Sequence, residues 1–93
     1  MAPRIVVVGL GPGDPSLVTA GVLAAIEAVP TRFLRTERHP SASLVGRAAT
    51  FDHHYEAAPT FDEVYRRIVA DLVAAATDHG EVLYAVPGSP RVL

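Results

Sequence analysis

Alternation of strand-like and helix-like segments constrains the fold of this sequence more than any other feature. The run from Ile5 to Leu10 is continuous, rich in β-branched residues and closed by glycine, which is typical of a strand buried on both faces. Further strands are predicted at residues 31–36, 51–55 and 81–86. Strands that alternate with helices form a parallel sheet with helices on its faces. The sequence therefore predicts an α/β fold with three layers and a parallel sheet of about four strands.

Three helix-like segments separate these strands, at residues 15–29, 41–49 and 60–79. Asp14 is suited to cap the first, and Pro15 would occupy its first position, where a missing N–H does no harm. Thr60 and Glu63 form a capping box at the start of the last helix. Its apolar residues recur at steps of three and four, which indicates an amphipathic stripe packed on the core: Phe61, Val64, Tyr65, Ile68, Val69, Leu72, Val73 and Ala76.

Composition limits the class of protein. A chain of 93 residues forms one small domain, and a hydrophobic content of 49% is enough for a core. The net charge of −2 favours neither nucleic acid nor an anionic membrane as a partner. The absence of cysteine excludes disulfides and thiolate chemistry. Because we find neither a secretory signal nor an apolar run near the length of a membrane span, we expect a cytoplasmic protein. All eight basic residues are arginine, which is typical of a GC-rich bacterial genome.

The loop GLGPGDPSL, residues 9–17, follows the first strand and is the first candidate site. Parallel sheets bind ligands at the carboxyl ends of their strands, where such loops lie. A dinucleotide-binding loop needs glycine at the position of Asp14, and a carboxylate there would repel a phosphate at a helix start. The lysine of a phosphate-binding P-loop is also missing. We therefore expect the loop to approach an uncharged or cationic small molecule with its backbone.

Gly11, Gly13 and Asp14 are assigned to the substrate side of this loop, but other interpretations stay open. The glycines could serve only a tight strand-to-helix turn, and Asp14 could act only as a helix cap. Glu37, at the end of the second strand, stands where a ribose-binding acid would be expected. A nucleotide-binding α/β domain is therefore an alternative hypothesis.

Two more turns lie at strand ends, at residues 38–41 and 87–90. The polar side chains around the former either line a cleft or form a solvated strand end: Arg35, Glu37, Arg38 and His39. The chain ends three residues after the latter turn. Because natural α/β domains rarely end on such a loop, we expect a fragment that lacks the next helix and strand.

A metal site is not predicted, although His53, His54 and Glu56 raise the question. In a strand, His54 and Glu56 would share one face while His53 would point away from it. No further ligand is evident from the sequence.

The motif G-x-G-P-G-D-P-x-L-x-T at residues 9–19, with RTERHP at 35–40 and YAVPGSP at 84–90, resembles the tetrapyrrole methylase superfamily. The chain is most similar to the methylase-like domain that precedes MazG-type nucleotide pyrophosphohydrolases in many bacteria. This resemblance extends over the whole chain, residues 1–93, but covers only the amino-terminal half of that domain. It implies that the second α/β half is absent.

The resemblance implies S-adenosylmethionine as the cofactor, held in a cleft between two α/β domains. Pro12 would contact the cofactor, and Gly88, Ser89 and Val92 would match the second cofactor-binding turn. Ser89 stands where most of these methylases have aspartate, and it can donate a hydrogen bond but brings no charge. The implied function is an S-adenosylmethionine-dependent methyltransferase-like domain that is inactive as a fragment. The alternative is a non-catalytic ligand-binding module that regulates a nucleotide pyrophosphohydrolase.

We expect the first strand at the centre of the sheet with the fourth beside it. Both strands are strongly apolar, and both end in glycine turns that must converge to form one site. The resemblance implies a further strand on the other side of the first, so the fragment should expose that edge. An exposed strand edge promotes pairing with another chain, and we therefore expect a homodimer.

Overall fold

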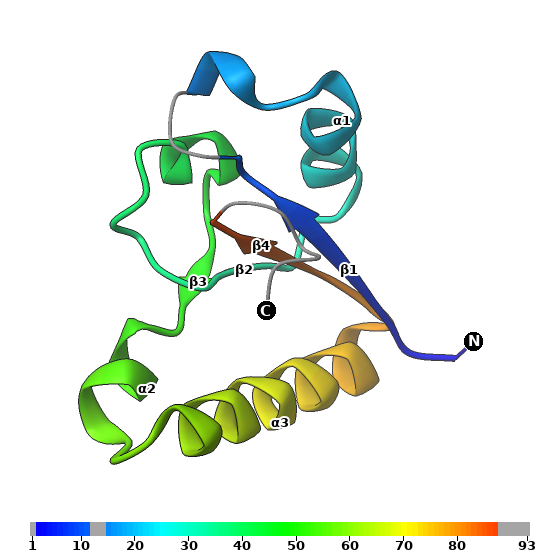
Figure 1. Cartoon of the computed structure of the whole chain (residues 1–93). Helices are drawn as coiled ribbons and strands as arrows, with labels where there is room; N and C mark the ends of the chain where they lie inside the picture. Colours follow the sequence, from blue (N-terminus) through cyan, green and yellow to red (C-terminus); the bar gives the residue numbers. More distant parts are fainter. Residues whose placement is uncertain (1, 12–14, 88–93) are drawn as a thin grey trace.

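A computed structural model describes residues 2–11 and 15–87 of the chain (Figure 1). Within these ranges the strands are β1 (Arg4–Gly9), β2 (Arg32–Leu34), β3 (Ala49–Thr50) and β4 (Glu81–Val86). The α-helices are α1 (Ala20–Ala28), α2 (Asp52–Ala57) and α3 (Phe61–His79). Two 3-10 turns complete the described elements, η1 (Pro15–Leu17) and η2 (Ala42–Val45). No described helix has both the length and the apolar character that crossing a membrane requires.

The strands form one parallel sheet in the order β1-β4-β2-β3. The sheet lies between α1 on one side and α3 on the other (Figure 1). This arrangement confirms the predicted α/β fold with a four-stranded parallel sheet.

The position of β1 was predicted wrongly. It pairs with β4 as expected, in register from Arg4 opposite Glu81 to Gly9 opposite Val86. However, β1 lies at the edge of the described sheet, and β4 lies between β1 and β2. Burial gives the physical reason, because every residue of β4 from Val82 to Val86 is buried, whereas β1 is mostly exposed. The longest buried run thus lies in β4, which has β1 on one side and β2 on the other.

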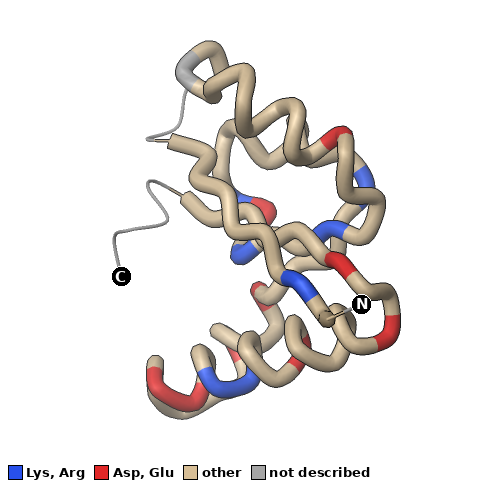
Figure 2. Tube along the Cα trace, turned by 90° about the vertical axis from the view of Figure 1, so that its right-hand side faces the viewer, with Lys and Arg blue, Asp and Glu red and all other residues tan. Residues whose placement is uncertain are grey.

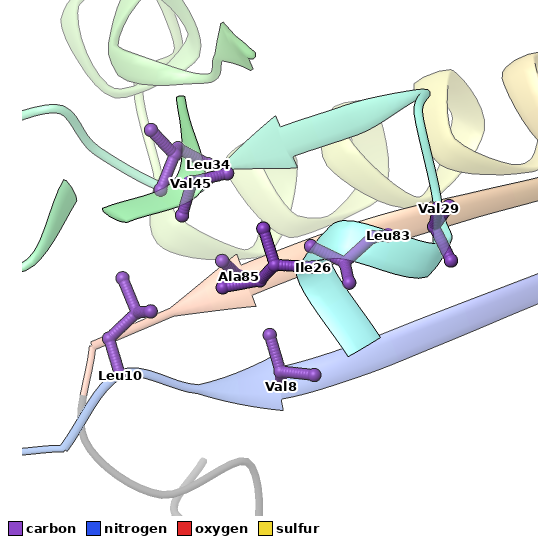
Figure 3. Packing of buried hydrophobic residues seen from close by; sticks show 8 residues of the cluster. All are labelled: Val8, Leu10, Ile26, Val29, Leu34, Val45, Leu83 and Ala85. Atoms are coloured by element: carbon purple, nitrogen blue, oxygen red, sulfur yellow. The ribbon is translucent and has the colours of Figure 1, made fainter. Parts of the chain in front are cut away.

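Two cores, one on each face of the sheet, divide the side chains of β4 between them. Leu83 and Ala85 point to the α1 side, as Figure 3 shows for the cluster of Val8, Leu10, Ile26, Val29, Leu34, Val45, Leu83 and Ala85. Val82, Tyr84 and Val86 point to the α3 side, in the cluster of Phe51, Val64, Ile68, Leu72, Ala76, Val82, Tyr84 and Val86. Alternate residues of a strand face opposite sides of the sheet, so a continuous apolar run supplies both cores.

Helix α3 begins and ends where the sequence predicts. The hydroxyl of Thr60 accepts a hydrogen bond from the Glu63 amide at 3.2 Å, and Gly80 ends the helix with a φ of 86°. Only half of its predicted apolar stripe is buried, namely Val64, Ile68, Leu72 and Ala76. The other half is exposed: Phe61, Tyr65, Val69 and Val73. The buried row packs against β4, while two members of the exposed row, Tyr65 and Val69, line a groove beside β1.

Helix α1 starts later than predicted. Thr19, not Asp14, is its cap, and the Thr19 hydroxyl accepts a hydrogen bond from the Val22 amide at 3.2 Å. Pro15, predicted as the first helical residue, lies in the separate turn η1. Asp14 itself lies outside the described residues. The helix therefore begins only where a side chain satisfies its first amides.

The segment from residue 41 to 57 also differs from the prediction. The helix expected at 41–49 is the short turn η2, which Gly46 ends with a φ of 72°. The strand expected at 51–55 is helix α2, and the third strand is β3 at Ala49–Thr50. Phe51, which is 2% exposed, joins the core under α3, and α2 continues from it across α3. Tertiary packing therefore overrides the weak strand pattern of this segment.

The outer edge of β1 adjoins an apolar groove on the α3 side of the sheet. No strand in the described part of the chain pairs with this edge. The groove has a volume of about 400 Å³, and its lining includes Ile5, Val7, Tyr65 and Val69, which are 36%, 45%, 45% and 57% exposed. An open strand edge beside exposed apolar side chains favours association.

We expect the 93-residue chain to form a dimer in which this edge and groove of one copy face those of the other. A Val7→Lys substitution would place a charge in the groove and should raise the dissociation constant at least about tenfold. Leu23→Lys is the matched control, because Leu23 is 41% exposed on α1, on the other side of the sheet. Sedimentation velocity measures both variants. A monomeric parent protein, or equal effects of the two lysines, would contradict this dimer.

Candidate functional site

The carboxyl ends of β1 and β4 lie side by side and begin the two glycine-containing loops. Gly9 is opposite Val86 in the parallel register, and the Leu10 amide donates a hydrogen bond to the Val86 carbonyl at 2.8 Å. Leu10 is 1% exposed and anchors the start of the first loop in the core. The expected approach of these two strand ends is confirmed for the described residues.

Gly11 continues the first loop with a φ of 74°. This left-handed backbone conformation costs a residue with a Cβ about 1–2 kcal/mol, so glycine is favoured there. The local backbone therefore favours glycine at position 11, close to the point where β4 also ends.

His39 connects the first loop to the segment that follows β2. The Ser41 amide donates a hydrogen bond to His39 Nδ1 at 3.0 Å, and His39 Nε2 lies 3.0 Å from the Gly11 carbonyl. Because an amide can only donate, Nδ1 must be the acceptor. Nε2 therefore carries the hydrogen and donates it to Gly11. His39 is thus a neutral brace of the loop, a role that sequence reasoning missed because the two segments are far apart in the chain.

Arg35 and Tyr84 form a polar pair at the groove beside β1. Arg35 Nε donates a hydrogen bond to the Tyr84 hydroxyl at 3.2 Å, and the Arg35 guanidinium carbon lies 5.9 Å from the centre of the Tyr84 ring. Burial raises the pKa of Tyr84, although the hydrogen bond from Arg35 opposes this shift. The pKa of Tyr55 is also raised by burial, with the charge of Arg35 acting against it. Both phenols therefore stay protonated through the physiological pH range.

A polar hollow of about 320 Å³ lies beyond β2, lined by Arg35, Thr36, Arg38, Asp52 and Tyr55. The Glu37 amide donates a hydrogen bond to Asp52 Oδ2 at 3.0 Å. Glu37 itself is exposed, and so is Arg38, which pairs with Glu56 at 3.6 Å. The four polar residues around this turn therefore fall into two groups. Arg35 and His39 have internal partners, while Glu37 and Arg38 form the solvated strand end.

Most of the cofactor and loop residues assigned from the sequence lie outside the described part of the chain. These are Pro12, Gly13, Asp14, Gly88, Ser89 and Val92. Gly11 is described, and it lies where the sequence placed it, at the end of β1. The roles assigned to all seven residues stay predictions.

The described strand ends offer backbone groups, a neutral imidazole and apolar side chains. The ends of β1 and β4 carry no charged residue at 9–11 or 86–87 (Figure 2). Charge is instead found on α3, at the beginning of β1 and around residues 35–38. This arrangement suits a ligand held by backbone hydrogen bonds and van der Waals contact, and it lacks the cationic partners of a phosphate.

Comparison with known proteins agrees with this fold. Residues 4–93 match the family described as Tetrapyrrole (Corrin/Porphyrin) Methylases. The chain is 38% identical over 96 residues to the uncharacterized protein YabN of Bacillus subtilis (strain 168). It also superposes on a uroporphyrin-III-C-methyltransferase of Thermus thermophilus with a TM-score of 0.75 and 24% identity. A native form of a uroporphyrin III C-methyltransferase from the same organism gives a TM-score of 0.64 and 25% identity.

These similarities cover nearly all of this chain but less than half of each relative. The matched region is 99% of this chain and 19% of YabN. For the first methyltransferase structure, it is 100% of this chain and 38% of the other. For the second structure, the shares are 97% and 38%.

The brace formed by His39 leads to a prediction about stability. His39→Ala removes two hydrogen bonds, each worth about 1 kcal/mol, so the free energy of unfolding should fall by about 1–2 kcal/mol. Ser43→Ala is the control, because Ser43 is an exposed residue of the same segment. Urea unfolding measures both. Equal stability of the His39→Ala variant and the parent would show that the brace contributes nothing.

The raised pKa of Tyr84 leads to a prediction about alkaline stability. Above about pH 10 the unfolded chain loses the phenol proton that the folded chain keeps, so the free energy of unfolding should fall as the pH rises. Tyr84→Phe should make this fall shallower, and Tyr55 should account for part of the remainder. Urea unfolding at a series of pH values from neutral upward gives the slopes. An unchanged slope in Tyr84→Phe would contradict the assignment.

Proposed function

The chain belongs to the family of tetrapyrrole (corrin/porphyrin) methylases, and we propose that its strand-end site binds S-adenosylmethionine. The proposal rests on the junction of β1 and β4. There the Leu10 amide donates a hydrogen bond to the Val86 carbonyl, and both candidate loops begin. Similarity to methyltransferases supports the choice of ligand. Residues 9–11 and 86–87 fit it, because they present backbone and apolar groups and carry no cation that would repel a sulfonium.

S-adenosylmethionine supplies an activated methyl group on its sulfonium, and the residues of this chain hold and orient the molecule. We assign Gly11 and its loop to one side of the ligand, with Pro12 in contact with it. Gly88, Ser89 and Val92 would approach from the turn after β4. His39 is a positioning residue in this scheme, since its Nε2 lies 3.0 Å from the Gly11 carbonyl oxygen and holds it in place.

We further propose that this chain forms only one wall of the site. It spans 38% of the methyltransferase that it resembles in fold, and a second α/β half would supply the other wall. A ligand held from one side keeps much of its surface in water. The 93-residue chain should therefore be catalytically inactive.

A finer assignment rests on the sequence resemblance. The chain would be the methylase-like domain of a longer cytoplasmic protein that continues into a MazG-type nucleotide pyrophosphohydrolase. Ser89 in place of aspartate removes a charge from the sulfonium environment, which favours a regulatory ligand-binding role as the second candidate function. Transfer of a labelled methyl group by the longer protein would favour the first candidate, and ligand-dependent pyrophosphohydrolase activity without transfer would favour the second.

We expect the 93-residue chain to bind S-adenosylmethionine no tighter than about 1 mM, equivalent to roughly −4 kcal/mol. In a titration followed by amide chemical shifts, the shifts should concentrate at residues 9–11, 39, 41 and 86. NAD should produce none of them. Micromolar binding by a monomer would contradict the one-wall proposal, and shifts elsewhere, or none at several millimolar, would contradict the site.

Two glycines give a matched pair of variants for this titration. Gly11→Ala and Gly80→Ala each force a Cβ into positive φ, of 74° and 86°, so each should lose about 1–2 kcal/mol of stability. Gly11 lies at the carboxyl end of β1, whereas Gly80 lies at the opposite end of the sheet, before β4. Only Gly11→Ala should weaken the shifts caused by S-adenosylmethionine. Equal weakening by both would show a general effect of instability.

A further inference from the structure

Helices α2 and α3 bring together three side chains that the sequence analysis kept apart. As a strand, residues 51–55 would place His53 and His54 on opposite faces; as helix α2, they place both rings next to α3. One potential ligand atom from each of His53, His54 and Asp71 lies within 4.8 Å of the other two. The ligand that was not evident from the sequence is therefore Asp71, which lies 17 residues after His54.

His54 is held in position from two sides. Its ring stacks on Phe51, with centroids 5.8 Å apart and planes 20° apart, and Phe51 is itself 2% exposed. Its Nε2 lies 2.6 Å from Asp71 Oδ2, and its side chain is only 13% exposed. The nitrogen is thus already directed at the carboxylate on α3, which lowers the cost of ordering these two ligands.

His53 completes the group from the solvent side. Its ring centroid is 4.1 Å from that of His54, and the residue is exposed. A tetrahedral ion with bonds of about 2.0–2.2 Å keeps its ligand atoms roughly 3.4 Å apart. The distances to His53 would therefore shorten by about 1.4 Å at most, which an exposed side chain can provide by rotation. The contact between His54 and Asp71 would open by less than about 1 Å.

The surrounding charges leave Asp71 available to a cation. Arg67, one turn earlier on α3, donates a hydrogen bond to Glu63 Oε1 at 3.2 Å. Within the described residues, the ion pair of Asp71 is with His54. Two imidazoles and one carboxylate suit zinc, nickel, copper or cobalt, whereas calcium and magnesium prefer oxygen ligands.

We propose that His53, His54 and Asp71 bind a divalent transition-metal ion of the zinc class. The ion ties α2 to α3, and it replaces the hydrogen on His54 Nε2 that now bonds to Asp71. That proton passes to solvent and another is taken up at Nδ1, so the imidazole stays neutral. Three protein ligands leave a fourth coordination position, which faces solvent on the side of the exposed His53. The site is separate from the strand-end site, because it lies in the layer formed by α2 and α3.

Calorimetric titration of the 93-residue chain with zinc ion tests this site. We expect one equivalent to bind with a dissociation constant of about 1–100 μM, and to raise the melting temperature because the ion binds only the folded chain. Magnesium ion at the same concentration should do neither. Absence of saturable zinc binding below about 1 mM, or equal binding of magnesium, would overturn the proposal.

Three variants locate the ion. His53→Gln keeps the contact between His54 and Asp71, so the metal-free protein should melt as the parent does while zinc affinity falls at least about tenfold. Asp71→Asn should lower the affinity similarly, and circular dichroism checks its fold. His79→Gln is the control, since His79 is an exposed histidine at the other end of α3. Zinc affinity that survives His53→Gln and Asp71→Asn, or that His79→Gln removes, would overturn the assignment.

Discussion

The pairing of β1 with β4 is the interaction on which the rest of the structure depends. β4 is buried over Val82–Val86 and has β1 on one side and β2 on the other. Its alternating side chains supply both cores, so α1 and α3 can each pack on the sheet. The same pairing ends with the Leu10 amide hydrogen-bonded to the Val86 carbonyl, which places the starts of the two loops side by side. The fold and the candidate site therefore both depend on the buried apolar residues Val82–Val86 of β4.

The sequence predicted the elements that have strong local signals. β1 and β4 follow from their uninterrupted apolar runs, and α3 follows from its capping box and its terminal glycine. The order of strands was harder, because an apolar run reports burial but not which strand lies on either side. The segment at 51–55 was predicted as a strand, but it is short and its pattern is weak. Contact of α2 with α3 decided its conformation, and such contact has no local signal.

The candidate site, like the fold, could be predicted from the sequence only in part. Parallel strands end at one edge of a sheet, so convergence of the carboxyl ends of β1 and β4 could be predicted from topology alone. The hydrogen bond from His39 to Gly11 could not be predicted from the sequence, because it depends on the path of the chain between β2 and η2. The group of His53, His54 and Asp71 was missed for a related reason. Its three members face one another only when α2 is a helix and lies across α3.

The open edge of β1 connects the question of assembly to the question of ligand binding. Ile5 and Val7 line the groove, and four residues after Val7 the chain reaches Gly11, whose carbonyl accepts a hydrogen bond from His39. Whatever covers the groove, a second copy or a further part of a longer protein, therefore packs against the strand that carries the first loop. Tyr84 lies on the same face, where Arg35 connects it to the end of β2. Because β1 and β4 both line this groove and both begin the candidate loops, an occupant of the groove and the proposed ligand would contact the same pair of strands.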